Sequence, residues 1–551
     1  MSTAKPWWVR TAERLPKELL TGSGPSLAQR RAMYASTHAT TLIGIDACPV
    51  RVEVEMRMSV PSFEVVGLAE AAVRESRVRV RSALYGVGVD LAESRVVVNL
   101  APADVRKSGS GFDLAVACAI LVAAGRVPSA LLEQTLCVGE LSLAGELRGV
   151  RGVLPQLLGA RAAGLRRAIV PADNAAEAAM VKGIEVYVAG TLHEVLQHLS
   201  GAACLSVPEP ELPAVRTHDE DLSDVRGQVV ARRALEVAAA GGHNLLLVGP
   251  PGAGKTMLAR RLPGILPSLS ESEALEVMAH ESVAGVGLDP ASVLRTRRRP
   301  FRAPHHTVSE VGLVGGGSPP KPGELSLAHH GVLFLDELPE FRRPALEAMR
   351  QPMEDGEVVV SRADFKTRFL ARPMIVGAMN PCPCGHHGVR GAPACRCAPE
   401  RVRAYANRIS GPLLDRFDLS VALSPTSYHD LSAQAAAESS ASVRARVESA
   451  RRIQQKRACS GLTRAATNAH TSSGELKRIA ALSGASEQLM ENAFRALRLT
   501  GRAHAKILRV SRTLADLEGS VDVHPHHLAE ALALRCPDSS SASTSSNKEI
   551  S

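Results

Sequence analysis

At 551 residues the chain is long enough for about two to four domains, and its 45% of apolar residues can fill several cores. The net charge of +9 suits an anionic partner, but only 3% of the residues are aromatic, which argues against binding nucleic acid by stacked aromatic side chains. No apolar run is long enough for a membrane span or a signal segment, and ten cysteines in 551 residues do not resemble a disulfide scaffold. We therefore expect a cytoplasmic protein with reduced thiols and no membrane partner.

Residues 1–35 form an N-terminal extension without a core-forming period, and we predict that it is disordered. The extension contains both tryptophans of the chain, Trp7 and Trp8. Two other interpretations stay open: a small docking segment, or a start codon assigned too early. In the second case Met33 is the natural start.

Residues 36–200 predict an α/β domain, because short strand-like runs alternate with helical ones. Single cysteines such as Cys118 and Cys137 lie in apolar runs and are expected in the core. Strands are predicted at 52–56, 63–66, 97–100 and 168–170, and a buried helix is predicted at 114–124.

Residues 201–222 are rich in proline and predict a linker, and a helix over 229–240 then opens a second domain at 223–425. Its most informative stretch is 249–256, which follows the apolar run 244–248 and precedes the helical run 257–262. A glycine loop between a strand and a helix turns its backbone N–H groups toward phosphates. Lys255 would reach the β- and γ-phosphates, and the Thr256 hydroxyl would bind Mg²⁺. The predicted nucleotide-binding residues are Gly249, Pro250, Pro251, Gly252, Ala253, Gly254, Lys255 and Thr256.

A second half-site follows the apolar run 332–335, where two carboxylates stand together. Asp336 would hold Mg²⁺ through water, since this metal prefers oxygen ligands and keeps several waters. Glu337 would act as the general base on the attacking water. Because a base is present, we expect ATP hydrolysis rather than mere nucleotide binding, with ATP and Mg²⁺ as cofactors.

Two basic insertions in this domain are candidate DNA contacts. The first, about 295–323, holds five arginines in eight positions together with glycines and prolines, so it cannot pack a core of its own. In the second, 357–361 and 367–370 are predicted to pair as a hairpin with Lys366 and Arg368 near its tip. A basic solvated surface is the alternative interpretation. The predicted DNA contacts are Arg297, Arg298, Arg299, Lys366 and Arg368, beside Arg295 and Arg302.

Four cysteines bracket a short loop rich in glycine, histidine and proline. Cys382 and Cys384 precede the loop, and Cys395 and Cys397 follow it. Two Cys pairs can supply four thiolates to a tetrahedral Zn²⁺, although the usual spacing within a pair is about two to four residues and here it is one. His386 and His387 are reserve ligands. Free thiols and redox-sensitive pairs are the alternatives to zinc.

Residues 426–536 have helical spacing and predict a C-terminal helical domain, and the Ser-rich tail 537–551 is predicted to be disordered.

Over residues 36–535 the chain resembles the magnesium-chelatase-like AAA+ ATPases of the YifB/ComM type. The motifs that carry this resemblance are 249–256, 302–307, 331–341, 380–385 and 411–418. It implies an α/β fold with a Lon-protease-like N-terminal domain, an AAA+ P-loop core and a helical lid. It also implies a hexameric, ATP-dependent DNA translocase or branch-migration helicase of recombination or natural transformation, acting on branched or single-stranded DNA.

The same resemblance implies three further catalytic residues. Asn380 matches the sensor that orients the attacking water. Arg416 matches an arginine finger that reaches the neighbouring subunit's ATP, with an ion pair to Asp415 or Asp418 as the alternative. Arg512 matches a second sensor on the lid, a part that Arg509, one helical turn away, could also play.

The N-terminal domain resembles the Lon protease domain at 138–147 and 169–174. Lon-type proteolysis needs a Ser nucleophile and a Lys base, but the matching positions hold Gly111 and Leu154, so no protease activity is expected. A DNA-binding or ring-organising role is the remaining expectation. A magnesium-chelatase motor subunit and a protein-remodelling ATPase stay open as alternative functions, although chelatase subunits lack the Lon-like domain.

Overall fold

The computed structural model describes residues 33–209, 220–285, 293, 296–317, 319–362, 365–389, 391, 393–425 and 437–535. The predictions for residues 1–32, Arg295 and the Ser-rich tail lie outside these ranges, as do residues 210–219 of the predicted linker. The chain divides into two compact units. The first comprises Met1–Ala214 and Met278–Arg295, and the second comprises Val215–Val277 and Thr296–Ser551.

The first unit is built on a mixed seven-stranded sheet. Strands β1 and β2 pair antiparallel, as do β2 and β4, and the other neighbours pair parallel. In spatial order the strands are β3 (Ser62–Val66), β4 (Ser94–Ala101), β2 (Asp46–Met58), β1 (Met33–Ile43), β5 (Thr135–Cys137), β8 (Arg167–Pro171) and β9 (Glu185–Ala189). A short pair, β6 (Glu140–Leu141) and β7 (Leu147–Arg148), lies outside this sheet.

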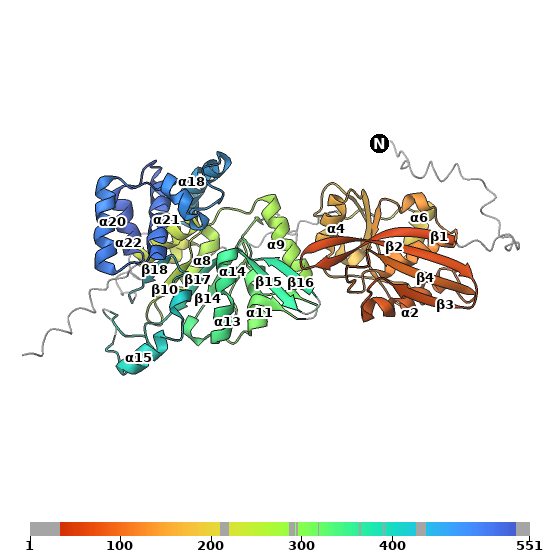
Figure 1. Cartoon of the computed structure of the whole chain (residues 1–551), viewed down its shortest axis with the longest axis horizontal. Helices are drawn as coiled ribbons and strands as arrows, with labels where there is room; N and C mark the ends of the chain where they lie inside the picture. Colours follow the sequence, from red (N-terminus) through yellow and green to blue (C-terminus); the bar gives the residue numbers. More distant parts are fainter. Residues whose placement is uncertain are drawn as a thin grey trace, which may run out of the picture. The chain divides into compact units, whose positions relative to one another are not determined.

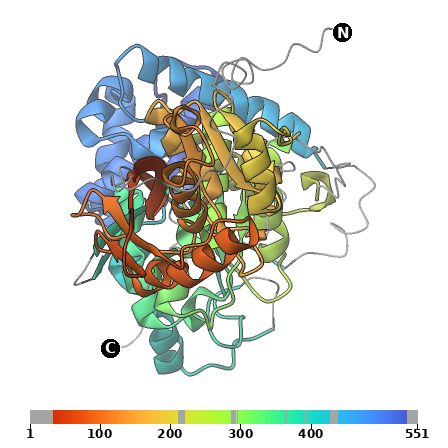
Figure 2. The ribbon, with the colours of Figure 1, turned by 90° about the vertical axis from the view of Figure 1, so that its right-hand side faces the viewer.

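Helices cover both faces of this sheet, as two threonines of β1 show. Successive strand residues point to opposite sides, so residues three positions apart contact different faces. In β1 the Thr37 hydroxyl donates to the Ala115 carbonyl of α3 (Asp113–Ala123) at 2.9 Å. The Thr40 hydroxyl, three residues on, donates to Gln156 of α4 (Val153–Ala162) at 2.7 Å. Helix α2 (Ala71–Gly86) packs on α3, and α6 (Leu192–Ser200) packs against β9. Figure 2 faces this unit and shows its strands and helices in red to yellow.

The predicted strands and the buried helix of the first unit are confirmed as β2, β3, β4, β8 and α3. Strand β1 begins at Met33, so the last residues of the predicted extension belong to the sheet. Strands β1, β5 and β9 were not predicted.

The second unit contains a five-stranded parallel sheet whose three central strands are apolar and almost wholly buried. Such near-continuous apolar strands are typical of a parallel sheet covered on both faces. In spatial order the five strands are β11 (Phe301–Arg302), β14 (Val332–Leu335), β17 (Met374–Met379), β10 (Leu245–Val248) and β18 (Leu419–Ala422). Helices α7 (Val229–Gly241) and α8 (Lys255–Ile265) pack against it. The carboxyl ends of β10, β14 and β17 therefore meet at one edge, where ligands bind in open α/β sheets.

Insertions between these strands carry short elements. The predicted hairpin is confirmed as β15 (Glu357–Arg362) and β16 (Phe365–Leu370), paired antiparallel. Helix α9 (Glu271–Ala284) begins in the second unit, and its residues from Met278 on belong to the first. Further elements of the second unit are α11 (Glu310–Val314), β12 (Gly315–Gly316), β13 (Lys321–Pro322), α12 (Glu324–Leu327), α13 (Arg343–Ala348), α14 (Arg350–Asp355), α15 (Pro399–Ala406) and α16 (Gly411–Leu414).

The predicted C-terminal helices are confirmed within 437–535 and appear in blue in Figure 1. They share a core with the parallel sheet, since α18 and α21 both pack on α7. The helices are α18 (Ser440–Cys459), α19 (Ser473–Ile479), α20 (Gly484–Leu497), α21 (Gly501–Glu518) and α22 (Pro525–Ala533). Among the described residues, no helix is both long and apolar enough to cross a membrane.

Candidate functional site: a P-loop with a paired acidic strand end

The glycine loop between β10 and α8 has the backbone that a phosphate cradle needs. Gly252 and Gly254 have φ values of 79° and 87°, a region that L side chains rarely adopt. Gly249 is required for space, because a Cβ there would lie 2.8 Å from the Cβ of Leu423. Helix α8 begins at Lys255, so its N-terminal N–H groups face the loop.

The Lys255 ammonium lies at the centre of the site. It donates to the carbonyl oxygens of Gly249 at 2.7 Å and Pro250 at 2.9 Å, and to Oδ1 of Asn380 at 2.9 Å. Burial lowers the pKa of Lys255, and the carboxylates of Asp336 and Glu337 oppose that shift. A cation held by neutral oxygens at a helix N-terminus is suited to donate hydrogen bonds to phosphate oxygens.

The residues predicted for Mg²⁺ are brought together. The Thr256 hydroxyl donates to Oδ2 of Asp336 at 2.7 Å, and Oδ1 of Asp336 accepts the backbone N–H of Glu337 at 2.9 Å. A hydroxyl and a carboxylate at hydrogen-bond distance are the oxygen donors that Mg²⁺ prefers. The donor set therefore fits the ion.

Glu337 follows Asp336; its side chain is 58% exposed, and its Oε2 lies 3.5 Å from Nδ1 of His306. Sequence reasoning quoted His306 within a motif but gave it no role. It also missed Gln228, which stands at the N-terminus of α7. The Gln228 amide donates to the carbonyl oxygens of Ala253, in the loop, at 3.3 Å and of Ser424 at 2.7 Å. The Gly227–Gln228 pair directly before a helix was the available signal.

Arg416 is held within its own chain. Its Nε donates to the Arg350 carbonyl at 3.0 Å, and its Nη2 lies 2.6 Å from Oε1 of Glu354 on α14. Its side chain is 12% exposed. The alternative interpretation named Asp415 or Asp418 as the ion-pair partner, whereas the structure shows Glu354. The local sequence could not reveal that partner, because it lies 62 residues earlier in the chain.

The backbone around Arg416 is clamped by the C-terminal helices of the same unit. Lys506 of α21 donates to the carbonyl oxygens of Asp415 and Phe417, and it lies 3.4 Å from Asp418. Arg535 donates to the carbonyl oxygens of Phe417 at 3.1 Å and Asp418 at 3.3 Å. Burial works against the Asp418 carboxylate, but His243 and Lys506 hold its pKa well below the ordinary value.

Arg512 lies inside the helical part of the unit, with 3% of its surface exposed. Its guanidinium pairs with Asp516 at 3.0 Å and donates to the carbonyl oxygens of Ile479, Ser520 and Val521. Arg509 donates to the Thr471 carbonyl at 2.9 Å. The contacts found for both arginines thus stabilise the helices, and their role as a second sensor stays a prediction.

The predicted DNA contacts differ in what they bind within the chain. Arg299 is not a surface residue: it pairs with Glu273 and donates to the carbonyl oxygens of Pro267 and His330. Arg297 and Arg298 are exposed. Lys366 is exposed, and its backbone lies opposite Ser361, one position before the last residue pair of the hairpin. The side chain of Arg368 forms an ion pair with Glu357. Lys366 and Arg297 are therefore the clearest basic positions on these insertions.

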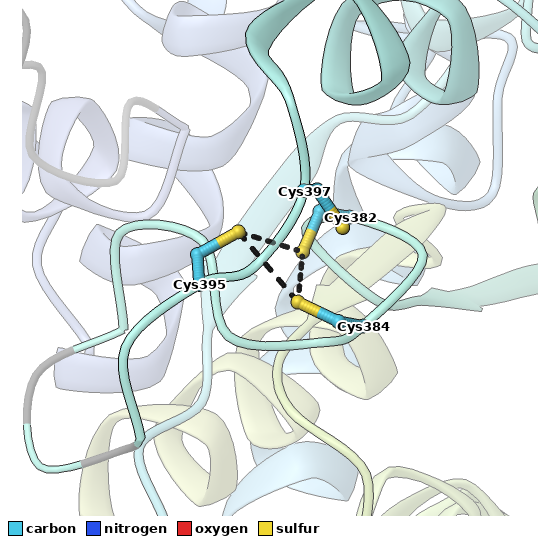
Figure 3. Close-up of side chains that lie close together, drawn as sticks. All are labelled: Cys382, Cys384, Cys395 and Cys397. Atoms are coloured by element: carbon cyan, nitrogen blue, oxygen red, sulfur yellow. Dashed lines mark hydrogen bonds between the residues drawn. The ribbon is translucent and has the colours of Figure 1, made fainter.

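The four cysteines of the predicted cluster converge (Figure 3). Sγ of Cys382 lies 3.3 Å from that of Cys384 and 3.7 Å from that of Cys395, and Cys384 and Cys395 are 3.6 Å apart. The Cys397 sulfur completes a group within 4.8 Å. The backbone N–H groups of Arg396 and His386 lower the pKa of the Cys384 thiol to about 5.

In the first unit, the positions matched to a Ser nucleophile and a Lys base lie in packed structure. The Gly111 carbonyl accepts the Gly139 N–H at 3.0 Å just before α3. Leu154 is 1% exposed on α4. Two residues after Gly111, the fully buried Asp113 pairs with Arg79 at 2.6 Å; its burial raises its pKa, and Arg79 opposes that shift.

A parallel sheet with a phosphate loop after β10 and two carboxylates after β14 defines a P-loop nucleoside-triphosphatase fold. The family model described as magnesium chelatase, subunit ChlI, matches residues 221–431. The models for subunit ChlI of Mg-chelatase and for the ChlI C-terminal region match 52–174 and 437–535.

Full-length relatives agree with these family models. The competence protein ComM of Haemophilus influenzae is 44% identical over 91% of this chain and 97% of its own length. The uncharacterized protein YifB of Escherichia coli is 42% identical over 91% of this chain and 97% of its own. Lon protease 2 of Bacillus subtilis is 30% identical over 31% of each chain. This chain belongs to the magnesium-chelatase-like AAA+ ATPases of the YifB/ComM type, a family that implies ATPase activity with ATP and Mg²⁺.

Proposed function

We propose that this protein is an ATP-driven motor that moves branched or single-stranded DNA through a ring of identical subunits, as a translocase or branch-migration helicase. The observation that carries the ATPase part is the convergence of Lys255, Thr256, Asp336 and Asn380 at one sheet edge, with Glu337 beside them. The DNA part draws on the exposed basic insertions and on the named competence role of the Haemophilus influenzae relative. The proposed setting is recombination or natural transformation in the cytoplasm.

The chain's residues divide the hydrolytic work. The loop N–H groups and Lys255 bind the phosphates, and Thr256 with Asp336 holds Mg²⁺, which neutralises charge on the phosphates when bound. Glu337 accepts a proton from the attacking water, and Asn380 orients that water. Lys255 currently engages Asn380, so incoming phosphate oxygens would replace that amide as acceptors and release it. Zn²⁺ takes no part in this chemistry and is a separate proposal.

Ring assembly follows from the proposed role of Arg416. An arginine that stabilises transition-state charge on a neighbour's ATP requires a closed oligomer, for which we propose a hexamer. Figure 1 labels α14, which carries the present partner of Arg416. Assembly would exchange the Glu354 pair for the neighbour's phosphate.

The decisive experiment measures ATP hydrolysis by the purified chain with and without a four-way DNA junction, and scores strand movement in the same sample. We expect DNA to stimulate hydrolysis and strands to move, and Lys255→Ala to abolish both. Lys366→Ala combined with Arg297→Ala should keep the DNA-free rate of hydrolysis but require more DNA for stimulation, because two phosphate contacts are lost. The binding of DNA by this variant should also depend less on salt concentration. Glu400→Ala, an exposed charge change on α15, is the control.

A motor acting on a protein is the second candidate, either as a chelatase-type subunit or as a protein-remodelling ATPase. It is favoured by the descriptions of the matching family models, which name a magnesium-chelatase subunit. Hydrolysis that ignores every DNA tested, without strand movement, would contradict the DNA motor and support this candidate.

A further inference from the structure

The sulfur atoms of Cys382, Cys384, Cys395 and Cys397 have the spacing of a metal tetrahedron. Four sulfurs at about 2.3 Å from one Zn²⁺ lie about 3.8 Å from one another. Three of the sulfur–sulfur distances in the structure are 3.3, 3.7 and 3.6 Å, and all four sulfurs lie within 4.8 Å of one another. All four are free thiols. Such close sulfurs from two separate chain segments would repel one another as thiolates, and a divalent cation removes that repulsion.

The surroundings of the sulfurs match a thiolate site. Cys382 is fully buried, and its Sγ accepts the backbone N–H of His387 at 3.4 Å. Backbone N–H groups directed at sulfur are the outer contacts that orient metal-bound thiolates. The loop between the two Cys pairs supplies these donors.

Two other groups in the described part of the chain offer three ligand atoms each, but their hydrogen bonds argue against a metal. His329 Nδ1 accepts the N–H of Arg372, so its proton is on Nε2, directed at Glu276. His527 Nδ1 likewise accepts the N–H of His524, which directs its Nε2 proton at Glu518. A protonated nitrogen cannot ligate a metal. The four-cysteine cluster has no such conflict.

The cysteine loop also touches the phosphate loop. Gly385, next to Cys384, has a φ of 85°, and a Cβ there would lie 2.4 Å from Cδ of Pro251. Cys382 follows two residues after Asn380, whose amide binds Lys255. The cluster is thus joined to the nucleotide site by one packing contact and one short stretch of chain.

We propose that Cys382, Cys384, Cys395 and Cys397 bind one Zn²⁺, and that the loop closed by this ion braces Pro251 so that the phosphate loop is shaped for ATP. The metal is a positioning element and touches neither ATP nor the attacking water. The second half of this inference rests on the proposed ATPase function, and the first half does not.

The metal is tested first, on the full chain purified with a thiol reductant and dialysed against a weak chelator. Elemental analysis should find about one Zn²⁺ per chain. Cys382→Ser combined with Cys395→Ser should remove it, whereas Cys459→Ser, an exposed cysteine elsewhere in the unit, should keep it. A wild-type chain that stays well below one Zn²⁺ after incubation with zinc salt overturns the metal site, and oxidation to disulfides under these conditions does so too.

The brace is tested with two glycine variants from the same loop. Gly385→Ala and Gly388→Ala both place an alanine at positive φ, at 85° and 68°, but only the first Cβ meets Pro251. Backbone strain is therefore matched, and the contact is the difference. We expect Gly385→Ala to weaken ATP binding about tenfold relative to Gly388→Ala, mainly through KM rather than kcat. Equal ATP affinities overturn the brace.

Zinc removal and return give a second readout that does not depend on folding of a variant. Stripping Zn²⁺ from the wild-type chain should weaken ATP binding, and adding Zn²⁺ back should restore it. Unchanged ATP affinity in the stripped chain overturns the coupling. A wild-type, zinc-loaded chain that binds no ATP contradicts the proposed ATPase function instead, while the Zn²⁺ content still decides the metal site.

Discussion

Glu337 has a left-handed backbone conformation, with a φ of 51°, which is uncommon for a residue with a side chain. Directly after β14, this turn leaves the carboxylate exposed beside His306, while Asp336 turns toward Thr256. Strained backbone of this kind clusters at functional sites. One strand end thereby separates the carboxylate proposed to bind Mg²⁺, Asp336, from the carboxylate proposed to take a proton, Glu337.

This separation predicts the behaviour of Glu337→Gln. The amide keeps the size of the side chain but cannot act as a base, so ATP should still bind with nearly unchanged affinity, while hydrolysis falls roughly 100- to 10,000-fold. Binding of a fluorescent ATP analogue and steady-state turnover measure the two effects. Glu340→Gln, on the same turn and paired with Arg408, is the control. Wild-type turnover by Glu337→Gln would exclude Glu337 as the base.

Among the individual site residues, those that stand next to one another in the chain could be predicted from the sequence. The phosphate loop and the acidic pair are short runs whose chemistry is visible without a fold. The partners of Arg416 and Arg299 were not predictable, because Glu354 and Glu273 meet them only through tertiary packing.

At the scale of elements, strands with clear alternation or a continuous apolar run were predictable, as the hairpin β15–β16 and strand β4 show. Strand β1 was hidden because its buried positions include threonines such as Thr37 and Thr40, whose hydroxyls are satisfied by α3 and α4. Strand β5 spans only Thr135–Cys137, too short for any period to appear.

Helix α6 carries a buried histidine, His198, and we predict that it makes the stability of the first unit depend on pH. Burial, aided by the charge of Arg167, lowers the pKa of His198 from 6.5 to about 4. The unfolded chain therefore binds a proton at a higher pH than the folded chain does. The free energy of unfolding is therefore unaffected by the titration of His198 above pH 6.5. It falls as the pH drops from 6.5 toward 4, by at most about 3 kcal/mol.

His198→Asn tests this dependence. Asn can accept the N–H of Leu205, as Nδ1 of His198 does at 3.1 Å, but it does not titrate. We expect the Tm of the wild type to fall more steeply than that of the variant between pH 6.5 and pH 4. All other titrating groups are common to both proteins, so the difference isolates His198. Parallel curves would show that His198 does not titrate in this range.

At the scale of the whole molecule, an arginine acting on a neighbouring subunit predicts complementation between two inactive variants. Lys255→Ala cannot bind ATP but keeps Arg416, and Arg416→Ala keeps its ATP site but lacks the finger. In a mixed ring, the ATP site of an Arg416→Ala subunit can meet the arginine of a Lys255→Ala neighbour.

Each variant alone should therefore hydrolyse little ATP, and mixing them should restore a measurable fraction of the wild-type rate. Co-purification of differently tagged variants verifies that mixed rings form. Mixed rings without recovered hydrolysis would place the action of Arg416 within its own subunit.

Lys506 and Arg535 bind the backbone of residues 415–418 and so connect the C-terminal helices to the segment that carries Arg416. Two of these hydrogen bonds run from Lys506 on α21 to main-chain oxygens, so a rotation of α21 must either break them or move the backbone of residues 415–418 with it. Together, Lys506 and Arg535 make four hydrogen bonds to the carbonyl oxygens of Asp415, Phe417 and Asp418. In the ring proposed above, a tilt of these helices would therefore move the backbone that carries Arg416 and change how far its side chain reaches toward the neighbouring subunit's ATP.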